Sequence, residues 1–112
     1  MASRQTISAP INQLFSVSSE AYRDLFEIWR HISSDSVALA DRVDAEFLAT
    51  FESLGLMPGQ GHVREDLTHK GILRFFPLHS YLIIYQHDAR PIRIVAVLRG
   101  KRNIKRILRE RS

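Results

Sequence analysis

Residues 72–108 read ILRFFPLHSYLIIYQHDARPIRIVAVLRGKRNIKRIL, and this stretch decides the fold. Three apolar runs, at residues 73–76, 81–85 and 92–98, are separated by short turn-forming segments. The middle run, YLIIY, is continuously apolar and rich in aromatic and β-branched residues, which predicts a central strand. Because the connections are short, we expect the three strands to form an antiparallel meander.

The third run alternates along the chain, which predicts one face toward a core and one face away from it. Gly100 is expected to end this strand, and residues 103–111 to form a short C-terminal helix. One strand face is predicted to carry Ile92, Ile94, Ala96 and Leu98, and the other Arg93, Val95, Val97 and Arg99.

Two helices are expected before the meander. In the first, Ser19 is the predicted N-cap, and apolar residues recur at helical spacing. The second spans residues 37–54, is capped by Asp35 or Ser36, and ends at Gly55 in the C′ position. The predicted apolar stripes are Leu25, Ile28, Trp29 and Ile32 in the first helix, and Ala40, Val43, Phe47, Phe51 and Leu54 in the second.

The expected fold is therefore α+β: an N-terminal strand at residues 14–18, then an antiparallel helix hairpin packed on a small antiparallel sheet. Residues 14–112 are one domain by size, and the polar residues 1–13 are predicted to be a flexible extension. No run of about 18 apolar residues and no secretory h-region occur. The absence of cysteine excludes disulfides and fits a cytoplasmic protein.

Charge is unevenly distributed. Residues 90–112 carry nine Lys or Arg and one acid, whereas residues 1–89 carry seven Lys or Arg and eleven acids. The overall charge of +4 therefore hides a segment of +8 next to a part of −4. This asymmetry predicts a basic working surface for an acidic protein or a polyanion.

The element order and several short segments together resemble the ParE branch of the ParE/RelE toxin superfamily, over about residues 15–108. The matching segments are DLFEIW (24–29), ADR (40–42), PGQGHVREDL (58–67), LRFFP (73–77), YLIIY (81–85) and VLRGKR (97–102). The resemblance implies a toxin of a type II toxin–antitoxin system that inhibits DNA gyrase by binding. It also implies a ParD-like antitoxin that neutralises the toxin, and a hetero-oligomer of the two.

RelE-like relatives instead cut mRNA on the ribosome, and this activity is the alternative. The resemblance places the RelE-type lysines at Leu73 and Phe75, the strand arginine at Leu82 and the tail tyrosine near Leu108, so most of the catalytic set is missing here. Residues 100–102 (GKR) are retained, and His79 or His87 could substitute as a base. The resemblance therefore favours a protein that acts by binding its target over an enzyme, and no catalytic residues are assigned.

The candidate contact residues follow from charge and from the resemblance. Partner grooves are expected beside the helix hairpin, together with an exposed edge strand suited to strand addition. No cofactor is expected, and the five histidines show no metal-ligand spacing. The predicted target-binding residues are Arg74, Arg99, Lys101, Arg102, Lys105, Arg106 and Arg109, and the predicted antitoxin-binding residues are His62, Tyr81 and Tyr85.

Overall fold

The computed structural model describes residues 14–111, so the predicted flexible extension, residues 1–13, lies outside the described range. The predicted α+β class is confirmed. The elements follow in the order β1 (Phe15–Val17), α2 (Ser19–Ser33), α3 (Val37–Leu56), the short 3-10 turn η1 (Pro58–Gln60), β2 (Leu73–Leu78), β3 (Tyr81–Gln86), β4 (Ile92–Arg99) and α4 (Ile104–Glu110).

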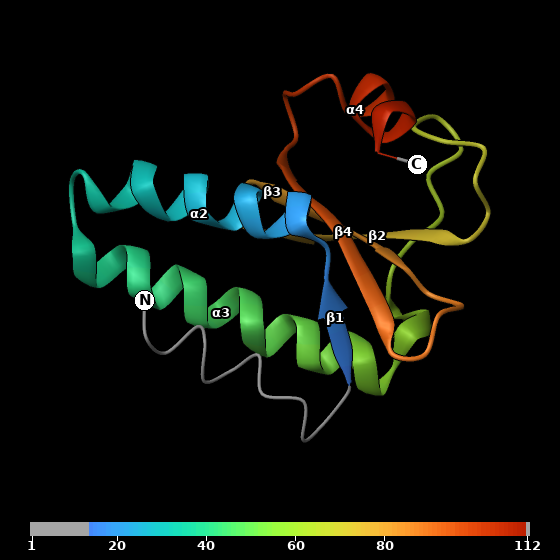
Figure 1. The fold of residues 1–112 in the computed structure, drawn as a ribbon, viewed down its shortest axis with the longest axis horizontal. Coiled ribbons are helices and arrows are strands. Elements are labelled where there is room, and N and C mark those ends of the chain that lie inside the picture. The colour runs from blue at the N-terminus through green and yellow to red at the C-terminus, as the bar shows by residue number, and fades with distance from the viewer. Residues whose placement is uncertain (1–13, 112) are drawn as a thin grey trace.

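The four strands form one mixed sheet in the order β1-β4-β3-β2. The predicted meander is present, because β3 pairs antiparallel with both β2 and β4. The N-terminal strand adds to the far side of β4 in parallel orientation, with Phe15 opposite Ile92. In Figure 1 the paired helices α2 and α3 lie along one side of the sheet, and α4 lies apart from them, near the loop that precedes β2.

Serine and asparagine side chains set where the helices begin. The predicted cap Ser19 is wrong by one position: the Ser18 hydroxyl accepts from the Ala21 N–H at 3.1 Å, and Ser19 is the first helical residue. Ser36 caps α3 in the same way, accepting from the Leu39 N–H at 3.1 Å. These hydroxyls satisfy N–H groups that have no partner inside their own helix.

Gly55 does not end the second helix as predicted, because α3 continues to Leu56. A side chain at Gly55 would collide with the backbone carbonyl of Leu14, whose Cβ would lie only 2.9 Å from the added atom. The glycine therefore lets the chain before β1 cross close to α3. Glycine is required at this position because Leu14 approaches α3 closely, and not because the helix ends there.

Two apolar clusters pack on opposite faces of the sheet. The one under α2 and α3 is built around Ala21, Leu25, Phe47, Phe51, Leu54, Ile83, Tyr85, Ile92, Ile94 and Val97. The one under α4 comprises Leu73, Phe75, Ile84, Ala96, Leu98, Ile104 and Leu108. A sheet covered on both faces explains why β3 reads as a continuous apolar run.

A bulge in β4 overturns the predicted alternation. Ile84 pairs with Ala96 whereas Tyr85 pairs with Ile94, so Val95 is an extra residue on β4. A bulge of this kind exchanges the two faces of the strand beyond it. Ile92 and Ile94 therefore face the helix hairpin together with Val97, while Ala96 and Leu98 face α4.

Trp29 also departs from its predicted place in the core. Its ring nitrogen donates a hydrogen bond of 2.8 Å to the Asp41 carboxylate of α3 at an exposed position. Ala21, Leu25 and Ile28 supply the inward stripe of α2 instead. Trp29 thus joins the two helices of the hairpin at their surface.

The sheet has two edges, β1 and β2, and the outward backbone N–H groups of β2 are not free for strand addition. Phe75 exchanges two backbone hydrogen bonds with His62, of 2.8 and 2.9 Å. The backbone N–H and C=O groups of the odd-numbered residues of β2 therefore point away from β3, toward the edge of the sheet. The Leu73 N–H donates to the Lys70 carbonyl at 3.1 Å, and Pro77 has no N–H. No outward N–H of β2 is left for another strand.

Candidate functional site

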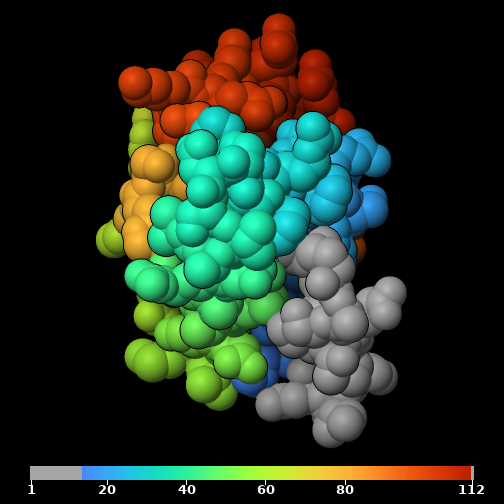
Figure 2. Space-filling view, turned by 90° about the vertical axis from the view of Figure 1, so that its left-hand side faces the viewer, coloured from blue at the N-terminus to red at the C-terminus, as the bar shows by residue number. Residues whose placement is uncertain are grey.

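One of the predicted basic residues lies apart from the other six along the sheet. Arg74 lies on the helix-hairpin face, where its guanidinium donates to the Gly71 carbonyl at 2.9 Å. The other six follow from Arg99 to Arg109 along the end of β4 and α4. Figure 2 shows this C-terminal segment, in red, as one block at one end of the molecule, bordering the helix hairpin. Arg74 does not share that surface.

Within residues 14–111, five of these cations have no carboxylate partner. The ion pairs among residues 14–111 involve other side chains, so all five can bind groups from outside the molecule. The five are Arg99, Lys101, Arg102, Lys105 and Arg106, which we call the C-terminal basic cluster. All five are exposed, which keeps them hydrated in the free protein.

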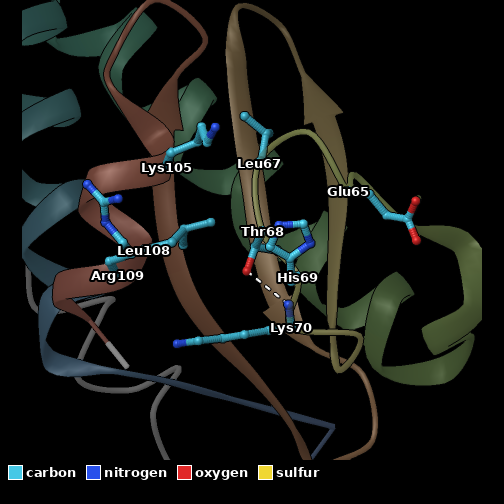
Figure 3. A pocket seen from close by; sticks show the side chains of 8 residues that line it. All are labelled: Glu65, Leu67, Thr68, His69, Lys70, Lys105, Leu108 and Arg109. Carbon is cyan, nitrogen blue, oxygen red and sulfur yellow. Dashed lines mark hydrogen bonds between the residues drawn. The ribbon is translucent and has the colours of Figure 1, made fainter.

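A groove of about 400 Å³ runs between α4 and the loop at residues 65–70. Figure 3 shows Lys105, Leu108 and Arg109 extending from α4, and Lys70 reaching toward the helix from the loop. Glu65 points away from α4 in this view. The remaining lining residues are Leu67, Thr68 and His69.

The loop side of this groove is held by its own polar contacts. The Thr68 hydroxyl accepts from the Lys70 N–H at 3.1 Å, and the Thr68 N–H donates to the Arg64 carbonyl. Arg64 and Asp66 form an exposed ion pair at 2.8 Å. The hydrogen bond from Arg64 lowers the pKa of Asp66, with a smaller contribution from the charge of Lys105 across the groove. The loop is therefore ordered by local bonds and not by deep burial.

The helix side of the groove is fixed by packing and by an ion pair. Ile104 and Leu108 are buried against the sheet, and the Asn103 side chain caps α4 by accepting from the Arg106 N–H at 3.2 Å. Beyond the helix, Arg111 forms a bidentate pair with Asp24 of α2, at 2.6 and 2.9 Å. Hydrogen bonding to Asp24 raises the pKa of Arg111, so the pair stays charged. Sequence reasoning missed this contact.

A second hollow, of about 220 Å³, lies between α2 and the end of β4. Its residues from α2 recur at i, i+3, i+4 and i+7, a spacing that could have revealed them as one face. They are Asp24, Glu27, Ile28 and His31, and they meet Tyr81, Val97, Arg99 and Arg102. The bulge at Val95 directs Arg99 to this side of the sheet.

The three predicted antitoxin contacts differ in accessibility. Tyr85 is fully buried, so its predicted partner contact is wrong and its role is structural. Its hydroxyl donates to the Pro58 carbonyl at 2.6 Å and accepts from the Gly61 N–H at 2.9 Å. Burial raises the pKa of this hydroxyl. Tyr81 is half-buried against Phe47, and His62 is exposed beside β2.

The positions discussed for RNA cleavage are dispersed. Leu73, Phe75 and Leu108 are buried in the core under α4. His79 lies in the β2–β3 turn and contacts Glu46 of α3 at 2.5 Å. His87 follows β3 at the opposite end of the sheet from Gly100, which bonds to the carbonyl of Ser80. Neither histidine lines the hollow that contains Arg102; His31 does.

Within residues 14–111, no group of three or more His, Cys, Asp or Glu side chains is placed to hold a metal ion. Over the same part of the chain, every helix is too short or too polar to cross a membrane.

Both the sequence and the fold are similar to those of known proteins. Residues 15–104 match the family model described as "ParE toxin of type II toxin-antitoxin system, parDE". A solved structure described as "Chromosomal ParDE TA system from P. aeruginosa" is similar in fold, with a TM-score of 0.62 and 17% sequence identity. The match covers 76% of this chain and 92% of that one. A search of curated proteins found no match.

Proposed function

Because the chain belongs to the ParE toxin family of type II toxin–antitoxin systems, we propose that it inhibits DNA gyrase by binding. A ParD-like antitoxin would neutralise it in a hetero-oligomer. Gyrase works in the cytoplasm, and the proposal places the toxin there.

One observation carries the proposal: the C-terminal basic cluster is exposed and makes no ion pair within residues 14–111. Cations held this way bind carboxylates or phosphates of a partner, and arginine does so with two parallel hydrogen bonds. Such a surface inhibits by occupancy and requires no reacting side chain. Gyrase, alone or with DNA, offers both kinds of anion.

Ribosome-dependent mRNA cleavage is the second candidate, and one feature favours it. His31, Tyr81 and Arg102 line the same hollow between α2 and β4, which would bring a base and a cation to a phosphodiester. The dispersed positions of the other RelE-type residues weigh against it. A third reading is a member without toxicity, whose role lies in the antitoxin complex.

Expression of the chain without antitoxin separates these readings. We expect purified toxin to block supercoiling by gyrase while leaving translated mRNA intact. Cuts in mRNA within translating ribosomes would instead establish the second candidate. If neither effect is observed, the third reading, a member without toxicity, would be supported.

The double variant Lys101→Ala/Arg102→Ala tests the surface. We expect it to lose toxicity while keeping the circular dichroism spectrum of the parent. The matched control, Arg30→Ala/Arg42→Ala, removes two exposed cations from the helix hairpin and should stay toxic. Persistent toxicity of a folded Lys101/Arg102 variant would refute binding through this cluster.

A further inference from the structure

The exposed surface of residues 99–109 has the composition of a phosphate-binding surface. This segment carries six Lys or Arg and no acid. Among residues 14–111, the exposed large apolar side chains all lie before residue 73, so none belongs to this surface. Surfaces that bind proteins have an apolar core from which charge is depleted, whereas surfaces that bind nucleic acid are polar and strongly positive. The C-terminal basic cluster has the second character.

The backbone that carries the cluster is ordered without a ligand. The Arg102 N–H donates to the Arg99 carbonyl at 3.0 Å, and this turn brings the two arginines close together. The Asn103 side chain accepts from the Arg106 N–H, and Ile104 is buried against the sheet. Because the backbone is already fixed, only side-chain freedom is lost when phosphates bind.

The absence of aromatic rings favours a duplex over a single strand. Proteins that bind single strands place aromatic side chains under successive bases, and residues 99–111 contain no aromatic side chain. A duplex keeps its bases stacked inside and presents dense rows of phosphates, which cations bind without any stacking platform. Double-stranded DNA is therefore the nucleic acid that this surface fits.

The polar side chains of the segment also favour binding that does not depend on base sequence. Adenine is read by asparagine or glutamine amides, and the only such amide in residues 99–111 is Asn103. Its oxygen already accepts the Arg106 N–H. The cluster is otherwise made of lysine and arginine, whose contacts to phosphates carry no sequence information.

We propose that the C-terminal basic cluster binds the sugar–phosphate backbone of duplex DNA, irrespective of its base sequence. DNA binding follows from the surface itself, whereas its use at gyrase rests on the proposed function. Gyrase carries duplex DNA, so a toxin that contacts both enzyme and DNA binds the complex more tightly than it binds the free enzyme. The anion held by the cluster is then a phosphate and not a carboxylate of gyrase.

The test measures the affinity of the intact protein by fluorescence anisotropy at several salt concentrations. The probes are short duplexes of two unrelated sequences, a single strand of the same length, and a polyglutamate peptide. We expect both duplexes to bind equally and more tightly than the other two probes. The slope of log affinity against log salt should be about −4, because each neutralised phosphate contributes about −0.9. Tighter binding of polyglutamate or of the single strand, or a clear preference between the duplexes, would overturn the proposal.

Two double variants locate the binding. Lys101→Gln/Arg106→Gln removes two charges from the cluster, and Arg30→Gln/Arg42→Gln removes two exposed charges from the helix hairpin. We expect the first to make the salt slope shallower by about 2 and to weaken duplex binding by about tenfold or more at low salt. The second should leave the slope unchanged. Equal effects of the two variants, with circular dichroism spectra like the parent's, would overturn binding through the cluster.

Removal of an acid provides the opposite test. Glu27 lines the same hollow as Arg99 and Arg102, where its carboxylate repels an approaching phosphate. Glu27→Gln should therefore tighten duplex binding by about threefold at low salt, whereas the exposed Glu52→Gln on α3 should have no effect. Equal responses of the two variants would contradict a contact between DNA and this end of the cluster.

Inhibition of gyrase is scored separately, so that the two proposals can fail independently. We expect the Lys101→Gln/Arg106→Gln variant to lose DNA binding and supercoiling inhibition together. A parent protein that inhibits gyrase but does not bind duplex DNA would overturn the DNA proposal and leave the proposed function standing. A parent protein that binds duplex DNA but does not inhibit gyrase would remove the proposed function and leave the DNA-binding assignment standing.

Discussion

Arg111 and Asp24, 87 positions apart, form a bidentate ion pair that joins the end of the chain to the first helix. The same carboxylate accepts the Val97 N–H of β4 at 3.0 Å, and Arg111 also donates to the Val95 carbonyl at 3.2 Å. One pair thus connects α2, β4 and the residue after α4. It holds α4 in the position that forms one wall of the groove.

Arg111→Ala should destabilise the protein by about 2–3 kcal/mol, somewhat below the value for a fully buried pair. The side chains of Arg111 and Asp24 are only 17% and 10% exposed, so the remaining carboxylate would be left largely desolvated. Urea unfolding measures the change. The neighbouring exposed Glu110→Gln should shift stability by less than about 0.5 kcal/mol. Equal stabilities of the two variants would show that the pair contributes nothing.

Tyr85→Phe tests the hydroxyl that joins the core to the loop after α3. The substitution leaves the Pro58 carbonyl and the Gly61 N–H without their partner, so we expect a loss of about 1–3 kcal/mol. Tyr81→Phe is the matched control, since its hydroxyl has no hydrogen bond within the described residues. A similar loss in both variants would mean that the hydroxyl bonds of Tyr85 are not responsible.

The buried hydroxyl of Tyr85 also predicts that stability depends on pH in the alkaline range. Burial raises the folded-state pKa of Tyr85 above its unfolded value of about 10. The neutral hydroxyl therefore contributes its full stability below that unfolded pKa, and the contribution is lost as pH rises through the folded pKa. Stability measured from pH 8 upward should fall more steeply in the parent than in Tyr85→Phe. Parallel curves would contradict the assignment.

Two nearby glycines should respond differently to alanine. A Cβ at Gly61 would lie 2.5 Å from the Tyr85 hydroxyl oxygen and 2.9 Å from the Arg74 Cβ, whereas one at Gly59 would meet nothing within 4 Å. We expect Gly61→Ala to cost about 1–3 kcal/mol through overpacking, and Gly59→Ala to be neutral or slightly stabilising. Thermal unfolding of the pair measures the difference. Equal melting temperatures would argue against close packing at Gly61.

His79 occupies a left-handed conformation, with φ of 56°, in the turn between β2 and β3. Glycine adopts this conformation without steric cost, which should offset the loss of the exposed contact to Glu46. His79→Gly is therefore expected to stay within about 0.5 kcal/mol of the parent, and His79→Val to cost about 1–2 kcal/mol. If Glu46→Gln destabilises as much as His79→Val, the contact and not the backbone conformation dominates.

Much of the fold was predictable because its signals are local. The run at residues 81–85 and the helical stripes around Leu25 and Phe47 depend on neighbours within one or two turns of chain, and all three elements formed as predicted. The bulge at Val95 was not predictable, because an extra residue leaves a run of apolar side chains looking unbroken. Its existence depends on pairing with β3.

The candidate site was less predictable for a related reason. The basic character of residues 99–109 is visible in the sequence, but its division between two hollows depends on the bulge and on the position of α4. Asp24 and Arg111 each look like ordinary surface charges, and nothing local marks them as partners. Tyr85 was predicted to contact a partner because it shares a strand face with Tyr81, yet the 3-10 turn covers it.

The bulge at Val95 has a consequence for comparisons among relatives. A homologue that lacked this single residue would alternate regularly from Ile94 through Ala96 and would still present its equivalent of Arg99 on the helix-hairpin side. A homologue of the same length that paired without the bulge would instead present that residue on the α4 side. A one-residue gap at Val95 therefore preserves the face on which the cation lies, whereas an ungapped alignment of β4 does not by itself show that two cations are equivalent.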